Sequence, residues 1–232
     1  MTEKGIDSLS QIGVNISSVE DYRKYIIDEF HKLYYDSNFA GGTWKNTFWL
    51  GVPTLKNPLD LWIYQELIYE LKPDKIIECG TAHGGSALFM ATMCDLINNG
   101  EVITVDIRDY ESRPQHNRIK YLLGSSVSTE IVGQIENSIG SRDTVMVVLD
   151  SDHSKKHVLN ELRTYSNLVS KESYMIVEDT NINGHPVWPE NGPGPMEAVE
   201  EFLGENNNFV VDNNREKFYL TFNPKGFLRK MK

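Results

Sequence analysis

The sequence has little cysteine, no long apolar run and no excess of positive charge. Only two cysteines occur in 232 residues, so a disulfide framework does not organise the fold, and we expect Cys79 and Cys94 to pack as reduced thiols. No stretch approaches the roughly 18 apolar residues of a membrane-spanning helix, and the first residues lack the apolar core of a signal peptide. We therefore expect a soluble, cytoplasmic protein.

The charge balance narrows the class of partner. The formal net charge is −10, and nucleic acid or an anionic membrane requires a basic surface. No nucleic acid partner is expected, and a small neutral or polar ligand fits better. The length suits one large domain with a short extension, which we divide into an N-terminal segment, 1–56, and a main domain, 57–232.

Most of the chain alternates short apolar runs with helical segments. Runs such as Val145–Leu149 are continuously apolar, as in strands buried on both faces of a parallel sheet. The alternation predicts an α/β fold, a doubly wound sheet with helices on both faces. The expected strands are Lys75–Cys79, Val102–Asp106, Ile119–Leu123, Thr144–Leu149 and Tyr174–Val177, and the expected helices are Ser18–Tyr35, Pro58–Lys72, Gly84–Ile97, Val127–Ile139, Ser154–Leu168 and Gly194–Leu203.

The C-terminal pattern differs from that alternation. Two further strands are expected, at Phe209–Val211 and Lys217–Phe222, with the polar segment Asn213–Glu216 between them as a hairpin loop. The sheet should therefore end in an antiparallel pair, whereas dinucleotide-binding halves more often continue with parallel units.

A glycine-rich turn follows the first predicted strand of the sheet, in Glu78-Cys79-Gly80-Thr81-Ala82-His83-Gly84-Gly85-Ser86. Glycine lets the backbone approach a ligand at the carboxyl ends of strands, where open α/β sheets bind cofactors. The spacing is not the G-x-G-x-x-G of a pyrophosphate-binding turn. A tight packing turn is the alternative.

The next two strand ends add polar groups on the same edge. Asp106 can accept both ribose hydroxyls of a nucleoside, in NAD and in S-adenosylmethionine alike, or it is a solvated loop acid. Ser125 and Ser126 would border the adenine, although Gly-Ser is also ordinary turn chemistry.

Three carboxylates, Asp150, Glu178 and Asp179, follow two neighbouring predicted strands. Acids this close repel unless protons or a cation neutralise them, and oxygen ligands suit Mg²⁺ or another hard divalent ion. Separate solvated acids are the alternative. His153 is close enough to accept a proton from a metal-bound hydroxyl, or it only begins a helix. His153 and His157 also have a zinc-ligand spacing, but no third histidine or cysteine ligand is evident.

Two aromatic segments border this predicted site. The loop containing His185 and Trp188 is a candidate wall for the acceptor, or a cover for the sheet edge. The segment Thr43–Val52 has more aromatic character than a linker needs, which suggests a lid or an oligomer contact, and we expect a homo-oligomer.

Taken together, several short motifs resemble the cephalosporin hydroxylase / rhamnosyl O-methyltransferase family, from about residue 40 to the C-terminus. They are Trp49-Leu50-Gly51-Val52, Pro58-Leu59-Asp60-Leu61-Trp62, Ile77-Glu78-Cys79-Gly80-Thr81 with Gly84-Gly85-Ser86, Leu149-Asp150-Ser151-Asp152-His153-Ser154, and Val177-Glu178-Asp179-Thr180 with Asn183-Gly184.

The resemblance implies a class I methyltransferase fold, Rossmann-like, with a seven-stranded mostly parallel sheet and an antiparallel last strand. It implies that S-adenosylmethionine binds to the glycine-rich turn and the neighbouring strand ends, that Asp106 holds the ribose, and that Asp150, Glu178 and Asp179 hold Mg²⁺. The residues assigned to the cofactor are Glu78, Gly80, Thr81, His83, Gly84, Gly85, Ser86, Asp106, Ser125, Ser126 and Asp150.

The more distantly similar catechol methyltransferases use a lysine as base where this chain would place His153, so the identity of the base differs. The hydroxylase part of the family name finds no support, since no two-histidine, one-carboxylate iron triad stands out.

The expected function is methyl transfer to a hydroxyl of a small molecule or glycan acceptor, with Mg²⁺ acidifying that hydroxyl and Asp150 and His153 as catalytic residues. One alternative is an NAD-dependent oxidoreductase, but its phosphate-binding glycine pattern and Tyr-x-x-x-Lys set are missing. The other is a non-catalytic assembly protein that keeps only the sheet.

Overall fold

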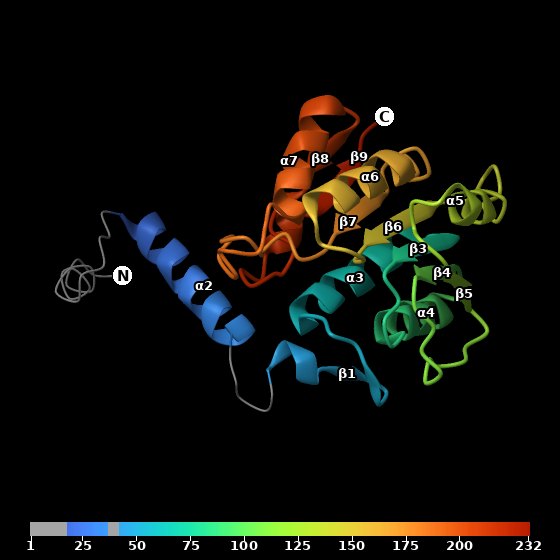
Figure 1. Ribbon diagram of the computed structural model, residues 1–232, viewed down its shortest axis with the longest axis horizontal. Coiled ribbons are helices and arrows are strands. Elements are labelled where there is room, and N and C mark those ends of the chain that lie inside the picture. The colour runs from blue at the N-terminus through green and yellow to red at the C-terminus, as the bar shows by residue number, and fades with distance from the viewer. Residues whose placement is uncertain (1–17, 37–41) are drawn as a thin grey trace.

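The computed structural model describes residues 18–36 and 42–232, so the predicted N-terminal segment lies partly outside the described residues. The main body is one sheet with helices packed on both faces, and the N-terminal helix projects from it (Figure 1). No helix in the described part of the chain is both long and apolar enough to cross a membrane.

Seven strands form the main sheet, in the order β5-β4-β3-β6-β7-β9-β8. All pairs are parallel except those made by β9, which is antiparallel to both β7 and β8. The predicted sheet class and the antiparallel end are therefore confirmed. The strands are β3 (Lys75–Cys79), β4 (Glu101–Asp106), β5 (Ile119–Leu123), β6 (Val145–Leu149), β7 (Tyr174–Val177), β8 (Phe209–Val211) and β9 (Phe227–Lys230).

The helices begin and end close to their predicted bounds. Asn57 caps α3 by accepting a hydrogen bond from the N–H of Leu59, and Ser154 caps α6. A small hairpin of β1 (Phe48–Trp49) and β2 (Val52–Pro53) precedes α3. The helices are α2 (Val19–Asp36), α3 (Pro58–Leu71), α4 (Gly85–Ile97), α5 (Thr129–Glu136), α6 (Lys155–Tyr165) and α7 (Pro195–Glu205), with short 3₁₀ turns η2 (Trp44–Asn46) and η3 (Asn213–Glu216).

The prediction of a last strand at Lys217–Phe222 is wrong, because β9 lies further along the chain. Tyr219 has a φ of +66°, which breaks an extended run. The end of the segment is used elsewhere: the N–H of Phe222 donates to Asp60 Oδ2 at 2.8 Å, and its carbonyl accepts from Asn181. The apolar side chains at the end of this segment pack between α3 and the loop after β7, so their pattern does not indicate a strand.

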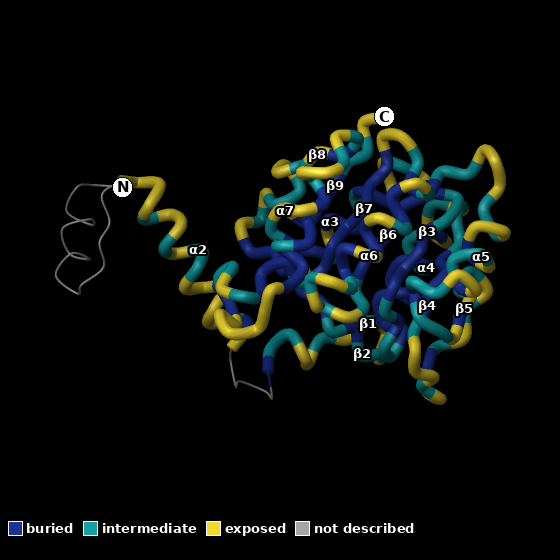
Figure 2. The backbone as a smooth tube through the Cα atoms, turned by 45° about the horizontal axis from the view of Figure 1, so that its top comes forward, coloured by how far each residue is buried: buried dark blue, intermediate teal, exposed yellow. Residues whose placement is uncertain are grey.

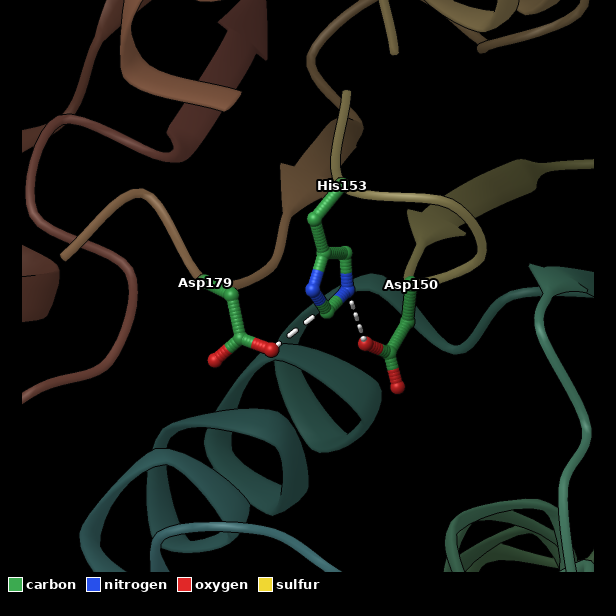
Figure 3. Close-up of side chains that lie close together, drawn as sticks. All are labelled: Asp150, His153 and Asp179. Atoms are coloured by element: carbon green, nitrogen blue, oxygen red, sulfur yellow. Dashed lines mark ion pairs between the residues drawn. The ribbon is translucent and has the colours of Figure 1, made fainter. Parts of the chain in front are cut away.

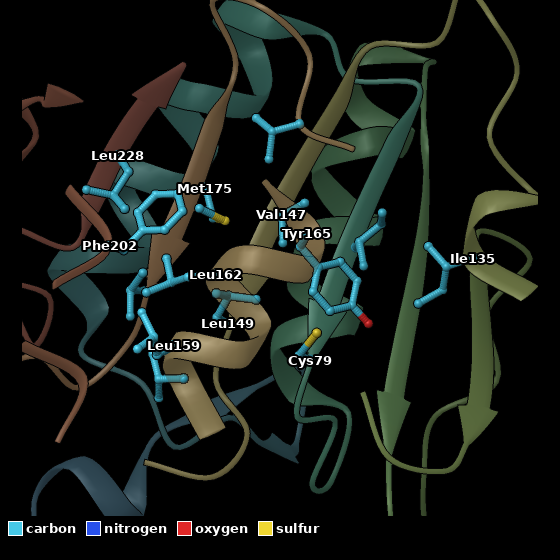
Figure 4. Packing of buried hydrophobic residues seen from close by; sticks show 14 of the residues in the cluster. Cys79, Ile135, Val147, Leu149, Leu159, Leu162, Tyr165, Met175, Phe202 and Leu228 are labelled. Atoms are coloured by element: carbon cyan, nitrogen blue, oxygen red, sulfur yellow. The ribbon is translucent and has the colours of Figure 1, made fainter. Parts of the chain in front are cut away.

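Alternate residues of each central strand face opposite sides of the sheet. Ile77 and Val147 lie in the cluster covered by α5, α6 and α7, whereas Ile76 and Met146 lie in the cluster covered by α3 and α4. Figure 4 shows the first cluster, with Tyr165 and Leu162 over the strands. Both cysteines are buried free thiols, Cys79 in the first cluster and Cys94 in the second.

The projecting helix α2 contacts the body mainly near its C-terminal end (Figure 2). His31 stacks on Phe222 with ring centroids 5.8 Å apart, and Tyr35 packs edge-on against the same ring. Ile26 and Phe30, apolar residues one helical turn apart on α2, are about half exposed. The homo-oligomer that was expected from the aromatic segment Thr43–Val52 remains a prediction.

Candidate active site

The turn after β3 requires glycine at two positions because other backbone lies directly against it. At Gly80 φ is +99°, and a Cβ atom would lie 1.8 Å from the carbonyl oxygen of Asp150. At Gly85 a Cβ atom would lie 2.3 Å from the carbonyl oxygen of Pro53. The turn is therefore packed against the end of β6 on one side and against the segment before α3 on the other.

Asp106, at the end of β4, holds the turn in place. Its Oδ2 accepts hydrogen bonds from the N–H groups of Thr81, at 3.1 Å, and Ala82, at 2.8 Å. Its Oδ1 accepts a hydrogen bond from the N–H of Arg108. The guanidinium of Arg113 lies 3.5 Å from its Oδ2. The acid predicted to bind ribose therefore also fixes the backbone of the glycine-rich turn.

A cavity of about 530 Å³ opens between this turn and the ends of β4, β5 and β6. Asp106 and Asp150 lie on its walls, and Pro53, Thr54 and Leu55 border it from the segment before α3. Nine of the eleven residues assigned to the cofactor line the cavity: Gly80, Thr81, His83, Gly85, Ser86, Asp106, Ser125, Ser126 and Asp150.

The other two, Glu78 and Gly84, support the cavity without lining it. Gly84 is the N-cap of α4. Glu78 is fully buried beneath the turn, where its carboxylate accepts hydrogen bonds from Ser86, at 2.5 Å, and Thr104, at 2.6 Å. Burial raises the pKa of Glu78 to about 7 in spite of these bonds.

The predicted acids and His153 meet at the ends of β6 and β7, where Asp150, His153 and Asp179 point toward one another (Figure 3). His153 Nε2 lies 3.4 Å from Asp150 Oδ1 and 3.4 Å from Asp179 Oδ2. Although the imidazole is about one-third exposed, its Nε2 atom is buried and makes no well-formed hydrogen bond.

Glu178 is turned away from that group, toward the interior. Its side chain is 2% exposed, and its Oε1 accepts a hydrogen bond from the hydroxyl of Tyr64 and lies 3.1 Å from Lys56 Nζ. Lys56 Nζ also lies 2.5 Å from Asp150 Oδ2. We refer to Lys56, Asp150, His153, Glu178 and Asp179 as the acid cluster.

The charges in the acid cluster shift one another's pKa values. Burial alone would raise the pKa of Asp150, but Lys56 and His153 together hold it below its ordinary value. Burial raises the pKa values of Glu178 and Asp179. Burial would lower the pKa of His153, but Asp179 and Asp150 outweigh it and raise that pKa to about 9, so in the metal-free protein the ring is protonated at neutral pH.

Comparison with known proteins decides the family. Residues 41–231 match the family described as Rhamnosyl O-methyltransferase/CmcI. The rhamnosyl O-methyltransferase of Mycobacterium leprae is 39% identical over 213 residues, which cover 88% of this chain and 90% of that protein. The chain belongs to the rhamnosyl O-methyltransferase/CmcI family.

Solved structures agree on the fold of this family. CmcI with Mg and SAM has a TM-score of 0.63 at 20% identity, covering 81% of this chain and 78% of that one. The methyltransferase MycE in complex with Mg, SAH and mycinamycin VI has a TM-score of 0.50 at 19% identity, over 74% of this chain and 48% of that one. The Rossmann-like methyltransferase fold expected from the sequence is confirmed.

The sequence alone did not single out Lys56 as a residue of the candidate active site. A lysine just before a helix cap usually points into solvent, and nothing local marks it as buried. The one available signal was that three predicted acids require a cation, which sequence analysis assigned entirely to a metal ion. The structure shows that part of this charge comes from Lys56.

The acid cluster has donors that suit a divalent ion. One ligand atom from each of Asp150, His153 and Asp179 lies within 4.8 Å of the others. The Nε2 atom of His153 is buried without a well-formed hydrogen bond, so it can serve either as a ligand or as a proton acceptor, whereas the carboxylates of Asp150 and Asp179 are the donors that a hard ion prefers. Of the three predicted metal ligands, Asp150 and Asp179 lie together here, whereas the Oε1 atom of Glu178 is occupied by Tyr64 and Lys56.

His157 is not part of this group, which removes the case for a zinc pair with His153 in the described residues. His157 lines the cavity, and its Nε2 lies 3.3 Å from the fully buried carboxylate of Glu161. Glu161 also accepts hydrogen bonds from Ser126, at 2.5 Å, and Ser151, at 2.6 Å. This network fixes the wall of the cavity at Ser126, where the adenine was expected.

The loop after β7 is held by its own hydrogen bonds. His185 Nε2 lies 2.8 Å from Glu197 Oε1, and Glu197 also accepts from Asn183 and from the N–H of Gly194. Trp188 remains 46% exposed and packs edge-on against Tyr35, which in turn stacks on Trp44. The two aromatic segments singled out in the sequence therefore meet in one cluster.

Proposed function

We propose that this protein transfers the methyl group of S-adenosylmethionine to a hydroxyl of a small molecule or sugar, with a divalent ion, most simply Mg²⁺, in the acid cluster. The observation that carries the proposal is the position of Asp150. It borders the cavity beside the glycine-rich turn and also belongs to the acid cluster. A cofactor in that cavity would therefore be next to the groups that can activate an acceptor.

The cofactor would lie along the carboxyl edge of the sheet. Gly80 and Gly85 let the turn pack directly against Asp150 and Pro53, which shapes the cavity, and Asp106 would accept from the ribose hydroxyls of the cofactor. The hydrogen bonds from Thr81 and Ala82 hold the Asp106 carboxylate in a fixed orientation, so the protein needs no rearrangement to receive the nucleoside.

Asp150 and Asp179 would hold the ion, with Glu178 beside them. A divalent ion there would bind the acceptor hydroxyl, lower its pKa and offset the negative field that keeps His153 protonated. His153 would then take the hydroxyl proton at Nε2, the atom that faces both carboxylates. Alignment of the oxygen with the sulfonium methyl is the protein's other contribution, because the methyl group is already activated.

The acceptor would rest against Trp188, the exposed member of the aromatic cluster that Tyr35 and Trp44 complete. Burial raises the pKa of Tyr35, and the negative charge of Asp179 raises it further. The curated relatives are named rhamnosyl O-methyltransferases, so a sugar hydroxyl is the first acceptor class to test. Aromatic faces of this kind are suited to the apolar face of a sugar ring.

The test combines ligand binding with methyl transfer. S-adenosylhomocysteine should raise the melting temperature and NAD should not, since only a ligand of the folded protein stabilises it. Transfer of labelled methyl into a panel of glycosides and phenols should require Mg²⁺ and should stop when a chelator is added. Transfer that persists with chelator and in Asp179→Asn would refute the metal part, and stabilisation by NAD alone would favour an oxidoreductase.

A further inference from the structure

Lys56 is a buried cation at the centre of the candidate active site. Its side chain is 4% exposed, and its Nζ contacts Asp150 Oδ2 at 2.5 Å and Glu178 Oε1 at 3.1 Å. In residues 18–36 and 42–232, no other lysine or arginine pairs with Asp150, Glu178 or Asp179. An isolated buried ammonium is very costly, so this position is tolerated only because two carboxylates meet it.

The backbone on both sides of Lys56 is fixed. The N–H of Lys56 donates to Thr47 Oγ1 at 3.3 Å, and the next residue, Asn57, caps α3. Pro53 lies against Gly85, where no larger residue would fit. Because Pro53, Thr54 and Leu55 line the cofactor cavity, Lys56 cannot leave the acid cluster through a backbone shift without disturbing that cavity.

The geometry of Asp150 separates the lysine from the place where an ion would bind. Lys56 contacts Oδ2, whereas Oδ1 faces His153 and, beyond it, Asp179. The lysine therefore orients Asp150 and leaves free the oxygen that faces the candidate ligands. In the ion-bound state, in which we propose that His153 is uncharged, three carboxylates against one ammonium leave two negative charges, and one divalent ion would neutralise them.

We propose that Lys56 is a built-in counter-ion that assembles the acid cluster before any metal binds, and that it remains in place beside the ion. Lys56 is thus a positioning residue, which acts through Asp150 and Glu178. The inference rests on the metal part of the proposed function, but its first consequence concerns the metal-free protein: the fold does not depend on the ion.

The main experiment compares Lys56→Met with the wild type in chelator and in millimolar Mg²⁺, using thermal unfolding. Without metal, Lys56→Met should lower the melting temperature by roughly 6–15 °C, because it leaves the buried carboxylate of Glu178 without a cation and leaves Asp150 with His153 alone. Mg²⁺ should restore a large part of that loss, whereas it should raise the wild-type melting temperature only slightly.

The matched control is Lys217→Met, which removes a lysine from an exposed ion pair with Glu66. It should change the melting temperature by less than about 3 °C, equally with and without Mg²⁺. The double variant Lys56→Met/Glu178→Gln should be more stable in chelator than Lys56→Met, since it removes an uncompensated charge and keeps an acceptor for Tyr64. It also serves if the single variant does not fold.

The proposal is overturned if Lys56→Met unfolds in chelator at the wild-type temperature, or if its loss is the same with and without Mg²⁺. Equal loss would mean that the lysine only fills space. The proposal is equally overturned if Lys56→Met/Glu178→Gln is no more stable in chelator than Lys56→Met. These outcomes are distinct from a failure of the proposed function, which would appear as wild-type protein that neither binds Mg²⁺ in calorimetry nor loses methyl transfer in chelator.

Discussion

The two halves of the candidate active site are built in different ways. The cofactor half is built around one continuous turn, from Gly80 to Ser86, which hydrogen bonds to Asp106 hold in place, and residues from other strand ends complete its walls. The acid half gathers Lys56, Asp150 and Asp179 from distant parts of the chain, and it keeps a buried nitrogen without a well-formed hydrogen bond. Under the proposed function, the first half would be a rigid receptor for the cofactor, and the second would act on the acceptor through its charges.

The largest expected effect tests the rigidity of the cofactor half. Gly80→Ala would place a Cβ atom 1.8 Å from the backbone oxygen of Asp150, at a residue with φ of +99°. We expect a loss of more than about 3 kcal/mol in the free energy of unfolding, and loss of the thermal shift produced by S-adenosylhomocysteine.

Gly133→Ala is the matched control, because nothing lies within 4 Å of its Cβ position in α5. It should stabilise the protein by up to about 1 kcal/mol, since alanine favours a helix. Chemical denaturation gives both free energies. A Gly80→Ala protein that still binds S-adenosylhomocysteine normally would show that the turn is not part of a fixed receptor.

The second effect tests the acid half, where the function depends on charge more than on packing. His153→Gln should lower the methyl-transfer rate by about 10²–10⁴-fold, because the group that accepts the hydroxyl proton is lost. The thermal shift with S-adenosylhomocysteine should persist, since His153 does not line the cofactor cavity.

The control for that variant is His116→Gln. This histidine is partly exposed, pairs with Asp95 and lies outside the acid cluster. Its rate should match the wild type. If both variants transfer methyl groups equally well, another group is the base, and the two halves of the site would differ less than their geometry suggests.

The same division explains what the sequence could predict. The glycine-rich turn and Asp106 follow from local rules, because a strand, a turn and a helix start are consecutive in the chain. The meeting of Asp150 and Asp179 could also be predicted, since the ends of adjacent parallel strands lie at one edge of the sheet. The position of Lys56 could not be predicted, because it depends on the packing of the segment before α3 against Gly85.

The prediction of a strand at Lys217–Phe222 is wrong for a related reason. The run Lys217–Phe222 has the composition of a strand, but Asp60 accepts the N–H of Phe222 and Asn57 donates to the carbonyl of Leu220. Side chains of α3 thus replace a neighbouring strand as hydrogen-bond partners. A period-2 pattern reports burial of alternate residues and does not identify what buries them.

The smallest effect concerns Glu197, at the start of α7, which holds the loop after β7 much as Asp106 holds the glycine-rich turn. Burial would raise the pKa of Glu197, but hydrogen bonds from His185, Gly194 and Asn183 lower it to about 2. A carboxyl whose pKa is lower in the folded than in the unfolded protein stabilises the fold above its unfolded pKa, and this contribution disappears as the pH falls toward the folded pKa.

Glu197→Gln should therefore cost about 1–2 kcal/mol at neutral pH, and the difference from wild type should shrink as the pH falls from about 4.5 to about 2. Glu200→Gln, which removes an exposed pair with Lys225 on the same helix, should cost less than about 0.5 kcal/mol at every pH. Denaturation curves across this pH range measure both. A constant difference for Glu197→Gln would mean that its hydrogen bonds do not depend on its charge, and that the loop is held instead by packing of Trp188 against Tyr35.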